Sequence, residues 1–543
     1  MIGIVVGSVA IGAGAYGAIR LRFPKKPTVY GSASRLSLFA AMQKNLFRAR
    51  GIPVGDWPPG QLQVYYEDTN AITFGPSGSG KGVTAIVPTL LNAPFVMLID
   101  VGGENTAIAI KFWRDQGYDV QVINPYGMHR GKPWNLPMQG FAIFEFLDPD
   151  DPQFAAHAGL FAEMLTKRTG RESGSTTFFQ DAGQSFKQRL IMHIKTALPK
   201  SEHHLGTLYR LVNLQADEWE QLLEDMKANP VADGMVAAGA TAMERREAQA
   251  PEEFSAIMST VQQDLEWLSD PMVRENLKRN DVDFGKLKGV DRQGRKVKGC
   301  ITSVVLPLEY ISTHAAIPRL ALSCATMTMQ RPPLAREKVV FVIDEAAALG
   351  KIKSFPDWLA TLRKYRVVLY PIFQNIGQVK ALYDREWQTF IANCGLRQFL
   401  GTGDLETAEY VHRLLGEFTA ESQSVNAEGK VSKSQTRRPL KTVEELLHFD
   451  GDKQIAFIGN LKPAILAKTP YWERPELRGC FYPNPYHHGR TPSSFVGSIK
   501  RLVGKLTYAV AFLLAPHPLA ALIYLGALGY GLLRLWEVLS HVL

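Results

Sequence analysis

The sequence predicts an α/β protein whose parallel, doubly wound sheet is interrupted by an all-helical insertion. Between residues 62 and 123, short apolar runs alternate with helix patterns, as in the strand–helix–strand units of a parallel sheet. Residues 150–295 contain only helix patterns, and apolar strand runs return at 301–307, 339–343 and 367–373. In a sheet of this kind the ligand binds at the carboxyl ends of the strands.

The composition is that of a globular protein of two or three domains. The chain has 543 residues, of which 46% are hydrophobic and 21% charged. Its formal net charge of +9 favours an acidic partner, either nucleic acid or the inner face of a membrane, although basic membrane proteins without such partners are common. The four cysteines lie far apart, which indicates free thiols in a reducing compartment and neither a disulfide framework nor a metal site.

The first residues resemble a membrane anchor. Residues 2–19 carry no charge and are long enough to span a bilayer, and four basic side chains follow within residues 20–26. By the positive-inside rule, these charges place the rest of the chain in the cytoplasm. A cleaved signal peptide is the competing interpretation, but no positive side chain precedes the apolar run. We therefore expect an anchor over residues 1–24 and a juxtamembrane linker over residues 25–61.

A glycine-rich loop follows the predicted strand at 71–74. Its glycines and lysine, Gly75, Gly80 and Lys81, fit the pattern G-x-x-x-x-G-K, in which backbone N–H groups and a following helix N-terminus hold phosphates. The Ser or Thr that usually follows the lysine and binds Mg²⁺ is replaced by Gly82, so a chance glycine turn before a helix is the alternative. The predicted nucleotide-contacting residues are Gly75, Pro76, Ser77, Gly78, Ser79, Gly80, Lys81, Gly82 and Val83.

Two acidic residues follow the next predicted strand, residues 95–99. Asp100 and Glu104 stand at its carboxyl end, where a catalytic role is possible. A helix N-cap followed by an acidic residue in the first turn explains them equally well.

A second acidic pair follows the apolar strand 339–343. Asp344 could hold Mg²⁺, and Glu345 could orient and deprotonate an attacking water. A surface acidic pair is the alternative, but it explains poorly why a buried strand runs directly into two carboxylates.

Two further polar residues flank the predicted strand 367–373. Gln374 follows it and could sense a γ-phosphate or simply cap the next element. Arg363 precedes it, within a basic run at 363–366, and could pair with phosphate or be solvated.

The helical insertion offers no catalytic pattern. Its predicted helices cover residues 154–165, 178–198, 205–214, 216–226 and 252–268. His203 and His204 are adjacent, and because neighbouring side chains do not face one metal ion, we interpret them as a solvated turn.

The last part of the chain changes character. Residues 417–438 are polar and predict a mobile loop. Residues 506–533 are nearly all apolar, broken only at 516–518, and predict a membrane segment, either one kinked span or a shallow hairpin. An amphipathic or buried tail helix is the alternative.

Several of these stretches together resemble one family, the type IV secretion coupling proteins, which are TraG/TraD-type ATPases that feed DNA into conjugation channels. The stretches are GPSGSGKGVTAIVPTLL at 75–91, FFQDAGQSFKQRLIMHI at 178–194, VVFVIDEAAALG at 339–350, YPIFQNIGQVKALYD at 370–384, NCGLRQFLGTGDLETAEYVHRLLG at 393–416 and RRPLKTVEELLHF at 437–449. The resemblance runs from about residue 30 to 474. It implies a RecA-like P-loop nucleotide-binding domain interrupted by an all-α domain, assembled as a homohexamer with ATP and Mg²⁺ between subunits.

The resemblance also implies roles for individual residues. Arg363 matches the arginine that reaches the neighbouring subunit's γ-phosphate, and Gln374 matches the sensor glutamine. Single-stranded DNA would pass through a central channel, for which Lys351 and Lys353 are candidate lining residues. Glycine at position 82 is common in this family, which leaves open what binds Mg²⁺ besides Asp344.

Two departures from the family limit the comparison. The usual D-P-K-G-E is D-V-G-G-E at residues 100–104, so no role for a lysine can be transferred there. The family also usually has two N-terminal membrane helices, where this chain shows one.

The resulting domain prediction has seven parts. They are a membrane anchor (1–24), a juxtamembrane linker (25–61), the first part of the nucleotide-binding domain (62–149), an all-α domain (150–295), the second part of the nucleotide-binding domain (296–480), a linker (481–505) and a C-terminal hydrophobic membrane segment (506–536).

The sequence thus predicts a coupling protein of the bacterial inner membrane with its ATPase domains in the cytoplasm. It would recruit relaxase-bound single-stranded DNA and drive it into a type IV secretion channel by ATP hydrolysis. Three alternatives are a coupling ATPase for effector proteins, a docking scaffold with little turnover, and a septal DNA pump. The helical insertion and the 393–416 stretch fit the last of these less well.

Overall fold

The computed structural model describes residues 28–58, 62–425 and 431–487. The predicted anchor at 1–24 and the C-terminal hydrophobic segment at 506–536 lie outside these ranges. Within the described ranges, no helix combines the length and apolar character needed to cross a bilayer.

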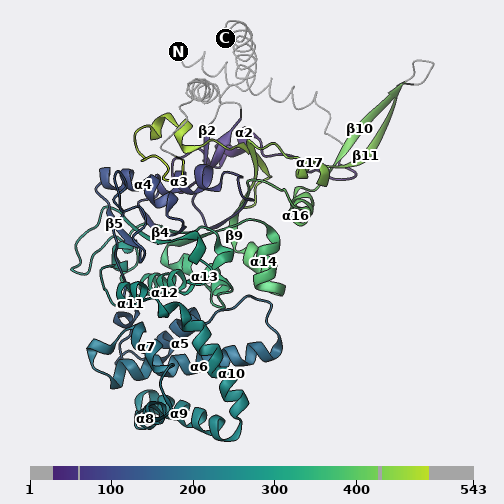
Figure 1. The fold of residues 1–543 in the computed structure, drawn as a ribbon. Helices are drawn as coiled ribbons and strands as arrows, with labels where there is room; N and C mark the ends of the chain where they lie inside the picture. The colour runs from purple at the N-terminus through teal and green to yellow at the C-terminus, as the bar shows by residue number, and fades with distance from the viewer. Residues whose placement is uncertain (1–27, 59–61, 426–430, 488–543) are drawn as a thin grey trace.

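An eleven-stranded sheet forms the centre of the molecule, with the order β2-β1-β13-β12-β9-β3-β8-β7-β4-β6-β5 (Figure 1). The seven strands from β9 to β5 are mutually parallel, and β12, β13, β1 and β2 continue the sheet beyond β9, each antiparallel to the strand before it. This confirms the predicted α/β class with a largely parallel sheet. The strands are β1 (Ile52–Trp57), β2 (Leu62–Tyr66), β3 (Asn70–Phe74), β4 (Phe95–Val101), β5 (Asp119–Ile123), β6 (Cys300–Leu306), β7 (Val339–Ile343), β8 (Val367–Phe373), β9 (Cys394–Phe399), β12 (Lys453–Ile458) and β13 (Ala464–Ala467).

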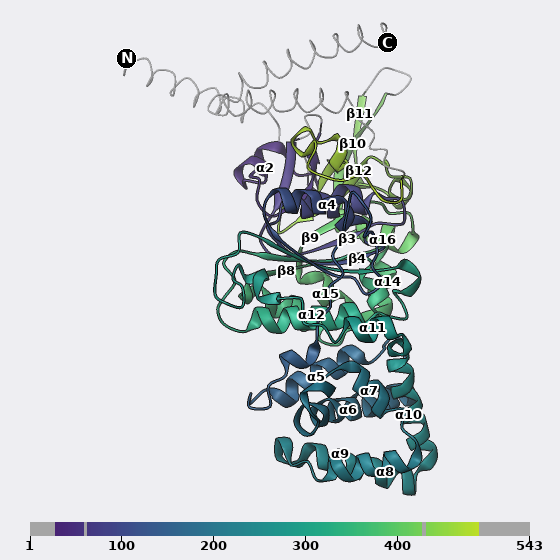
Figure 2. The same cartoon turned by 60° about the vertical axis from the view of Figure 1, so that its left-hand side comes forward.

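Helices cover both faces of the sheet (Figure 2). Successive side chains of a strand point to opposite faces, so every residue of a strand covered on both sides is buried. In β4, Val96 and Leu98 pack in the same cluster as α3 (Val87–Leu90) and α4 (Glu104–Asp115). Met97 and Ile99 pack in the other cluster, which contains α12 (Ala316–Gln330).

The remaining described helices of the sheet-containing part follow β7, β8, β9 and β11 (Val431–Pro439). They are α13 (Phe355–Thr361), α14 (Ile376–Tyr383), α15 (Trp387–Ala392), α16 (Leu405–Leu415) and α17 (Val443–Leu447).

Every described secondary-structure element between β5 and β6 is a helix. This confirms that an all-α part interrupts the sheet. The long α6 is contacted by α5, α9 and α10, and α5 also packs against α12 beneath the sheet (Figures 1 and 2). The helices are α5 (Phe154–Leu165), α6 (Gly174–Ala197), α7 (Leu205–Leu211), α8 (Ala216–Lys227), α9 (Val231–Gln249), α10 (Pro251–Leu265) and α11 (Pro271–Asn276).

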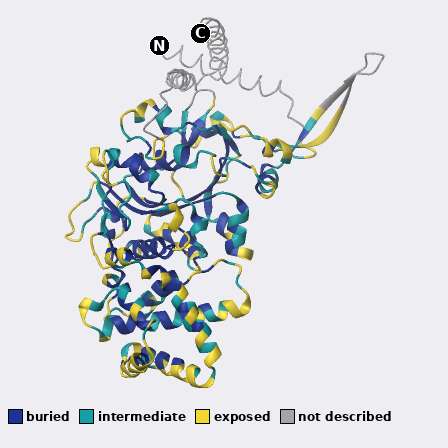
Figure 3. Cartoon of the chain, in the orientation of Figure 1, coloured by how far each residue is buried: buried dark blue, intermediate teal, exposed yellow. Residues whose placement is uncertain are grey.

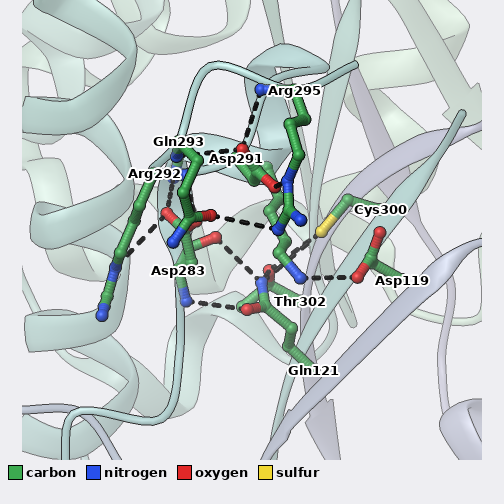
Figure 4. A network of polar contacts seen from close by, with 11 residues as sticks. Asp119, Gln121, Asp283, Asp291, Arg292, Gln293, Arg295, Cys300 and Thr302 are labelled. Atoms are coloured by element: carbon green, nitrogen blue, oxygen red, sulfur yellow. Dashed lines mark hydrogen bonds and ion pairs between the residues drawn. The ribbon is translucent and has the colours of Figure 1, made fainter. Parts of the chain in front are cut away.

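A polar network ties the end of this insertion to the sheet edge (Figure 4). The Gln121 side chain on β5 donates to the Asp283 carbonyl and to Thr302 Oγ1 on β6, both at 3.0 Å, and accepts from Asp283 N at 2.7 Å. Lys286 Nζ donates to Asp119 Oδ1 at 2.6 Å. These contacts fix the returning chain at the amino ends of β5 and β6.

The prediction of a linker over residues 25–61 is wrong for part of this range. It contains α2 (Leu38–Gln43) and β1, which pairs with β2 and β13 inside the sheet. The β1 sequence IPVGDW lacks a strand pattern because it contains proline, glycine and aspartate. Its buried Asp56 lies 3.2 Å from the buried Arg474, a partner more than 400 positions away.

The prediction of a mobile loop over residues 417–438 is also wrong. β10 (Glu417–Val425) and β11 (Val431–Pro439) pair as an antiparallel hairpin that projects from the molecule (Figure 1). Residues 434–438 of β11 are exposed, in contrast to the sheet (Figure 3). Backbone pairing forms the hairpin without an apolar face, so hydrophobic periodicity does not reveal it.

Candidate nucleotide site

The glycine-rich loop connects β3 to the helical turn that begins at Gly82. Gly78 and Gly80 have positive φ values, +77° and +88°, and such residues turn successive N–H groups toward one anion. A Cβ on Gly75 would stand 2.4 Å from Ser79 Oγ and 3.1 Å from Lys81 Cγ, so a larger residue there would displace side chains of the loop. Ser79 Oγ is buried, and among the described residues no hydrogen bond reaches it. The loop therefore has the geometry of a phosphate cradle.

Lys81 lies between this loop and the end of β7. Its Nζ donates to the Gly75 carbonyl at 2.9 Å and lies 3.7 Å from Glu345 Oε2. The lysine charge is therefore held at the mouth of the loop, beside a carboxylate from a different strand.

Gln374 joins the same group from β8. Its Nε2 donates to Glu345 Oε1 at 2.7 Å, so Lys81, Glu345 and Gln374 form one chain of contacts. Glu345 has a φ of +53°, which is uncommon for a residue with a side chain and costs conformational energy. The three residues follow β3, β7 and β8, adjacent parallel strands whose carboxyl ends share one edge of the sheet.

Asp344 faces a second polar group at the end of β4. Asn105 Nδ2 donates to Asp100 Oδ1 at 2.9 Å and to Asp344 Oδ2 at 3.3 Å. Burial, together with the nearby carboxylates of Asp100 and Glu345, raises the pKa of Asp344 to about 7, while Lys81 opposes the shift. A bound cation would favour the ionised form of this carboxyl group.

Asp100 has mainly a capping role. Its Oδ2 accepts hydrogen bonds from the backbone and the hydroxyl of Thr106, both at 2.6 Å, in the first turn of α4. Burial raises the pKa of the Asp100 carboxyl group, although these hydrogen bonds oppose the shift. Glu104 points elsewhere and accepts from Asn484 Nδ2 at 2.5 Å.

Arg363 is not brought to this site within one chain. It lies just before β8, at the amino ends of the parallel strands, and is exposed. Of the two candidate channel lysines, Lys353 pairs with Asp181 of α6 at 2.7 Å, and Lys351 is part-buried.

Two residues of the site were not predicted. Asn105 contacts both Asp100 and Asp344, and Lys468 Nζ donates to the carbonyls of Ser79 and Leu400, which supports the loop from behind. The missing hydroxyl at Gly82 could have prompted a search for a polar side chain such as Asn105. No local sequence pattern indicates that Lys468 contacts the loop.

The residues present fit a nucleotide with Mg²⁺. The left-handed glycines and the unpartnered Ser79 hydroxyl suit a phosphate group, while Asp344 across from Lys81 provides a carboxylate oxygen, which Mg²⁺ prefers as a ligand.

The comparisons with known proteins agree on one family. The family model described as "Type IV secretory system Conjugative DNA transfer" matches residues 40–492. Protein VirD4 of Rhizobium rhizogenes is 23% identical over 432 residues, covering 76% of this chain and 60% of that protein. A conjugal transfer protein TraG of Escherichia coli is 25% identical over 469 residues, covering 78% of this chain and 71% of that protein. The chain thus spans about 60% of the length of its VirD4 relatives.

Solved structures show the same fold. The bacterial conjugative coupling protein TrwBdeltaN70, in complex with sulphate, superposes with a TM-score of 0.61 at 15% identity, covering 82% of this chain and 96% of that one. TrwB in complex with ADP and Mg²⁺ gives a TM-score of 0.58 with the same coverage. Identity this low establishes the fold alone.

Proposed function

Because the chain belongs to the type IV secretory system conjugative DNA-transfer family, we propose that it is an ATP-hydrolysing coupling protein that drives single-stranded DNA into a secretion channel. The contact chain of Lys81, Glu345 and Gln374 beside the phosphate cradle is the observation that carries this proposal. The related TrwB has been solved with ADP and Mg²⁺ and with an ATP analogue, which supports ATP as the nucleotide here.

Each residue of the site has a task in this proposal. The loop N–H groups and Lys81 bind the phosphates, and Asp344 holds Mg²⁺, which neutralises phosphate charge when it is bound. Glu345 has one oxygen fixed by Gln374 and the other facing Lys81. In this position it can orient a water molecule and accept its proton. Gln374 links the phosphate end of the site to this base.

Arg363 has a task only if a second copy of the chain is present. It is exposed at the sheet edge opposite the loop, where it could reach the nucleotide of a neighbouring subunit. We therefore extend the proposal to a ring of six copies with shared sites, which surrounds the DNA and receives it with its relaxase. The uncharged stretch 2–19, followed by four basic side chains within residues 20–26, supports a position in the inner membrane with the ATPase in the cytoplasm.

The test is the ATP turnover of the purified protein with and without single-stranded DNA, at two salt concentrations. We expect DNA to stimulate turnover, and the stimulation to fall as salt rises, because phosphate contacts release counterions. Turnover that does not change when DNA is added would overturn the proposal that DNA is the cargo, and would favour an effector protein as the cargo. No turnover under any condition would favour a docking scaffold.

A further inference from the structure

We propose that the side-chain oxygen of Asn105 is the Mg²⁺ ligand that this P-loop lacks at Gly82. The inference rests on the proposed ATP site and names the residue that completes it. In the usual pattern a Ser or Thr hydroxyl directly after the lysine binds the metal, and glycine has no side chain to do so. Asp344 is then the only ligand identified so far.

The amide of Asn105 is held in one orientation. Asn105 lies in the first turn of α4 and is only 4% exposed. Its Nδ2 group donates to two carboxylates, Asp100 at 2.9 Å and Asp344 at 3.3 Å. An ionised carboxylate accepts hydrogen bonds and cannot donate one, so with both carboxylates ionised, as a bound cation favours, the NH₂ end faces them and the oxygen end faces away.

The oxygen end faces the position of the missing hydroxyl. A Cβ built on Gly82 would stand 3.2 Å from Asn105 Oδ1. Across the described parts of the chain, no hydrogen bond ends on Oδ1, although the side chain is buried. No described protein donor therefore competes with a metal ion for this oxygen. The oxygen thus occupies the space that a serine or threonine at position 82 would need.

The chemistry of this oxygen suits the metal. Mg²⁺ prefers hard oxygen ligands, and amide carbonyls belong to this class together with carboxylates. The same amide also donates to Asp344, so the two ligands hold each other in place. Glycine at position 82 and asparagine at position 105 therefore form a pair, in which the small residue makes room for the oxygen of the large one.

A purely structural role is the competing explanation, because Asn105 also positions Asp100 and Asp344. The two explanations differ in what a new hydroxyl can repair. Serine at position 82 would restore a metal ligand in an Asn105→Ala protein, but it would not restore the hydrogen bonds to Asp100 and Asp344. The double variant Asn105→Ala/Gly82→Ser therefore separates them.

The experiment measures the affinity for a fluorescent ATP analogue, mant-ATP, once with Mg²⁺ and once with EDTA. For the unchanged protein we expect tighter binding with Mg²⁺. Asn105→Ala should keep the affinity for mant-ATP in EDTA. The increase in affinity that Mg²⁺ causes should be smaller in this variant by about tenfold or more. The double variant should regain most of that gain. Thr106→Val, which removes a buried hydroxyl that donates to Asp100 from the same helix turn, should keep the gain.

Each contrary result has a distinct meaning. A normal Mg²⁺ gain in Asn105→Ala would overturn the inference. Loss of the gain in Asn105→Ala without recovery in the double variant would also overturn it, in favour of a positioning role. If the unchanged protein bound no mant-ATP in either condition, the ATP site itself would be wrong, and the inference would fall with it.

A second measurement needs no substitution, and so does not depend on whether Asn105→Ala folds. The unchanged protein is labelled with ¹³C at the side-chain carbonyl of asparagine and loaded with Mn²⁺ and ADP. Coordination by Oδ1 predicts a ¹³C hyperfine coupling in the electron–nuclear double resonance spectrum that is absent from unlabelled protein. The absence of this coupling in labelled protein would overturn the inference.

Discussion

Lys81 is the residue on which the proposed phosphate site depends most. Its Nζ lies between the Gly75 carbonyl and Glu345, where it can reach both a phosphate and the proposed base. Lys81→Ala should lower ATP turnover by about a hundredfold or more, because a fixed positive charge at the transferring phosphate is lost. The fold should remain, since Lys81 belongs to neither hydrophobic cluster and its Nζ contacts the loop carbonyl and Glu345. A steady-state assay with a circular dichroism spectrum checks both points.

Lys298→Ala is the matched control for this variant. Lys298 is an exposed lysine just before β6, at the amino edge of the sheet, and its Nζ donates to the Gln116 carbonyl. It should keep normal turnover. If Lys81→Ala also hydrolysed ATP normally, the loop would not be the working phosphate site.

The cysteines give a second prediction at this scale. All four are free thiols, and Cys300, Cys324 and Cys394 are buried while Cys480 is part-exposed. Burial raises the pKa of Cys300 to about 12. Only the thiolate reacts, and a thiol with so high a pKa stays almost entirely protonated at pH 8. Iodoacetamide should therefore modify Cys480 in the native protein and the other three only after unfolding, as measured by mass spectrometry. Rapid native modification of Cys300 would contradict this packing.

At the scale of elements, a buried ion pair connects two helices of the all-α part. Lys187 on α6 contacts Asp264 on α10, and both side chains are buried. Lys187→Met should lower the free energy of unfolding by about 3–5 kcal/mol, because Asp264 is left as an unpaired buried charge. Adding Asp264→Asn should recover part of the loss, since the amide is neutral and still accepts the Lys167 backbone N–H. Urea unfolding measures both. Equal stability of Lys187→Met and the unchanged protein would refute the pairing.

The same pair gives a pH dependence with a defined sign. Burial lowers the pKa of Lys187 from the ordinary 10.5 to about 8, although Asp264 opposes the shift. Between these values the unfolded chain holds the proton more firmly than the folded one. This group therefore makes the folded state gain stability as the pH rises from about 8 to 10.5. The difference between the unchanged protein and Lys187→Met should widen over that range.

The elements also show where sequence reasoning succeeds. Long apolar runs predicted β4, β7 and β8 closely, because strands covered on both faces must be apolar throughout. The helix α12 was missed for a related reason. It is buried on nearly all sides, so it lacks the polar face that marks an amphipathic helix. β1 and the β10–β11 hairpin depend on pairing partners rather than on local pattern.

The candidate site was likewise predicted in part from the sequence. Lys81, Glu345 and Gln374 each end or follow a recognisable strand, and parallel strands bring such positions to one edge. Asn105 was missed because a polar residue in the first turn of a helix has an ordinary local explanation. Its contact with the Gly82 position exists only after the crossover from β3 to β4 has folded.

At the scale of the whole molecule, Arg363 reaches a nucleotide only in the proposed ring, where a second copy of the chain is present. Lys81 lies beyond the carboxyl ends of the parallel strands, and Arg363 lies at their amino ends. This arrangement suits a head-to-tail ring, in which one surface meets a different surface of the next copy. Arg363→Ala should bind ATP normally and lose turnover. Mixing it with Lys81→Ala should restore activity, since about a quarter of the interfaces in a random ring combine an intact lysine with an intact arginine.

Lys364→Ala is the matched control for the arginine. It removes an exposed positive charge one position further along the chain and should hydrolyse ATP normally. Suppose that Arg363→Ala binds ATP and that both variants assemble. If the mixed proteins then recovered no turnover, the shared-site proposal would be wrong.

In the proposed function, ATP hydrolysis at the Lys81–Glu345 site moves single-stranded DNA. The most direct measurement is the ATP-dependent release of streptavidin from biotinylated single-stranded DNA, with Glu345→Gln as the variant that should bind ATP without hydrolysing it. We predict that the unchanged protein displaces streptavidin only when ATP is hydrolysed, and that Glu345→Gln does not displace it. DNA-stimulated hydrolysis without displacement, or equal displacement by Glu345→Gln, would contradict the claim.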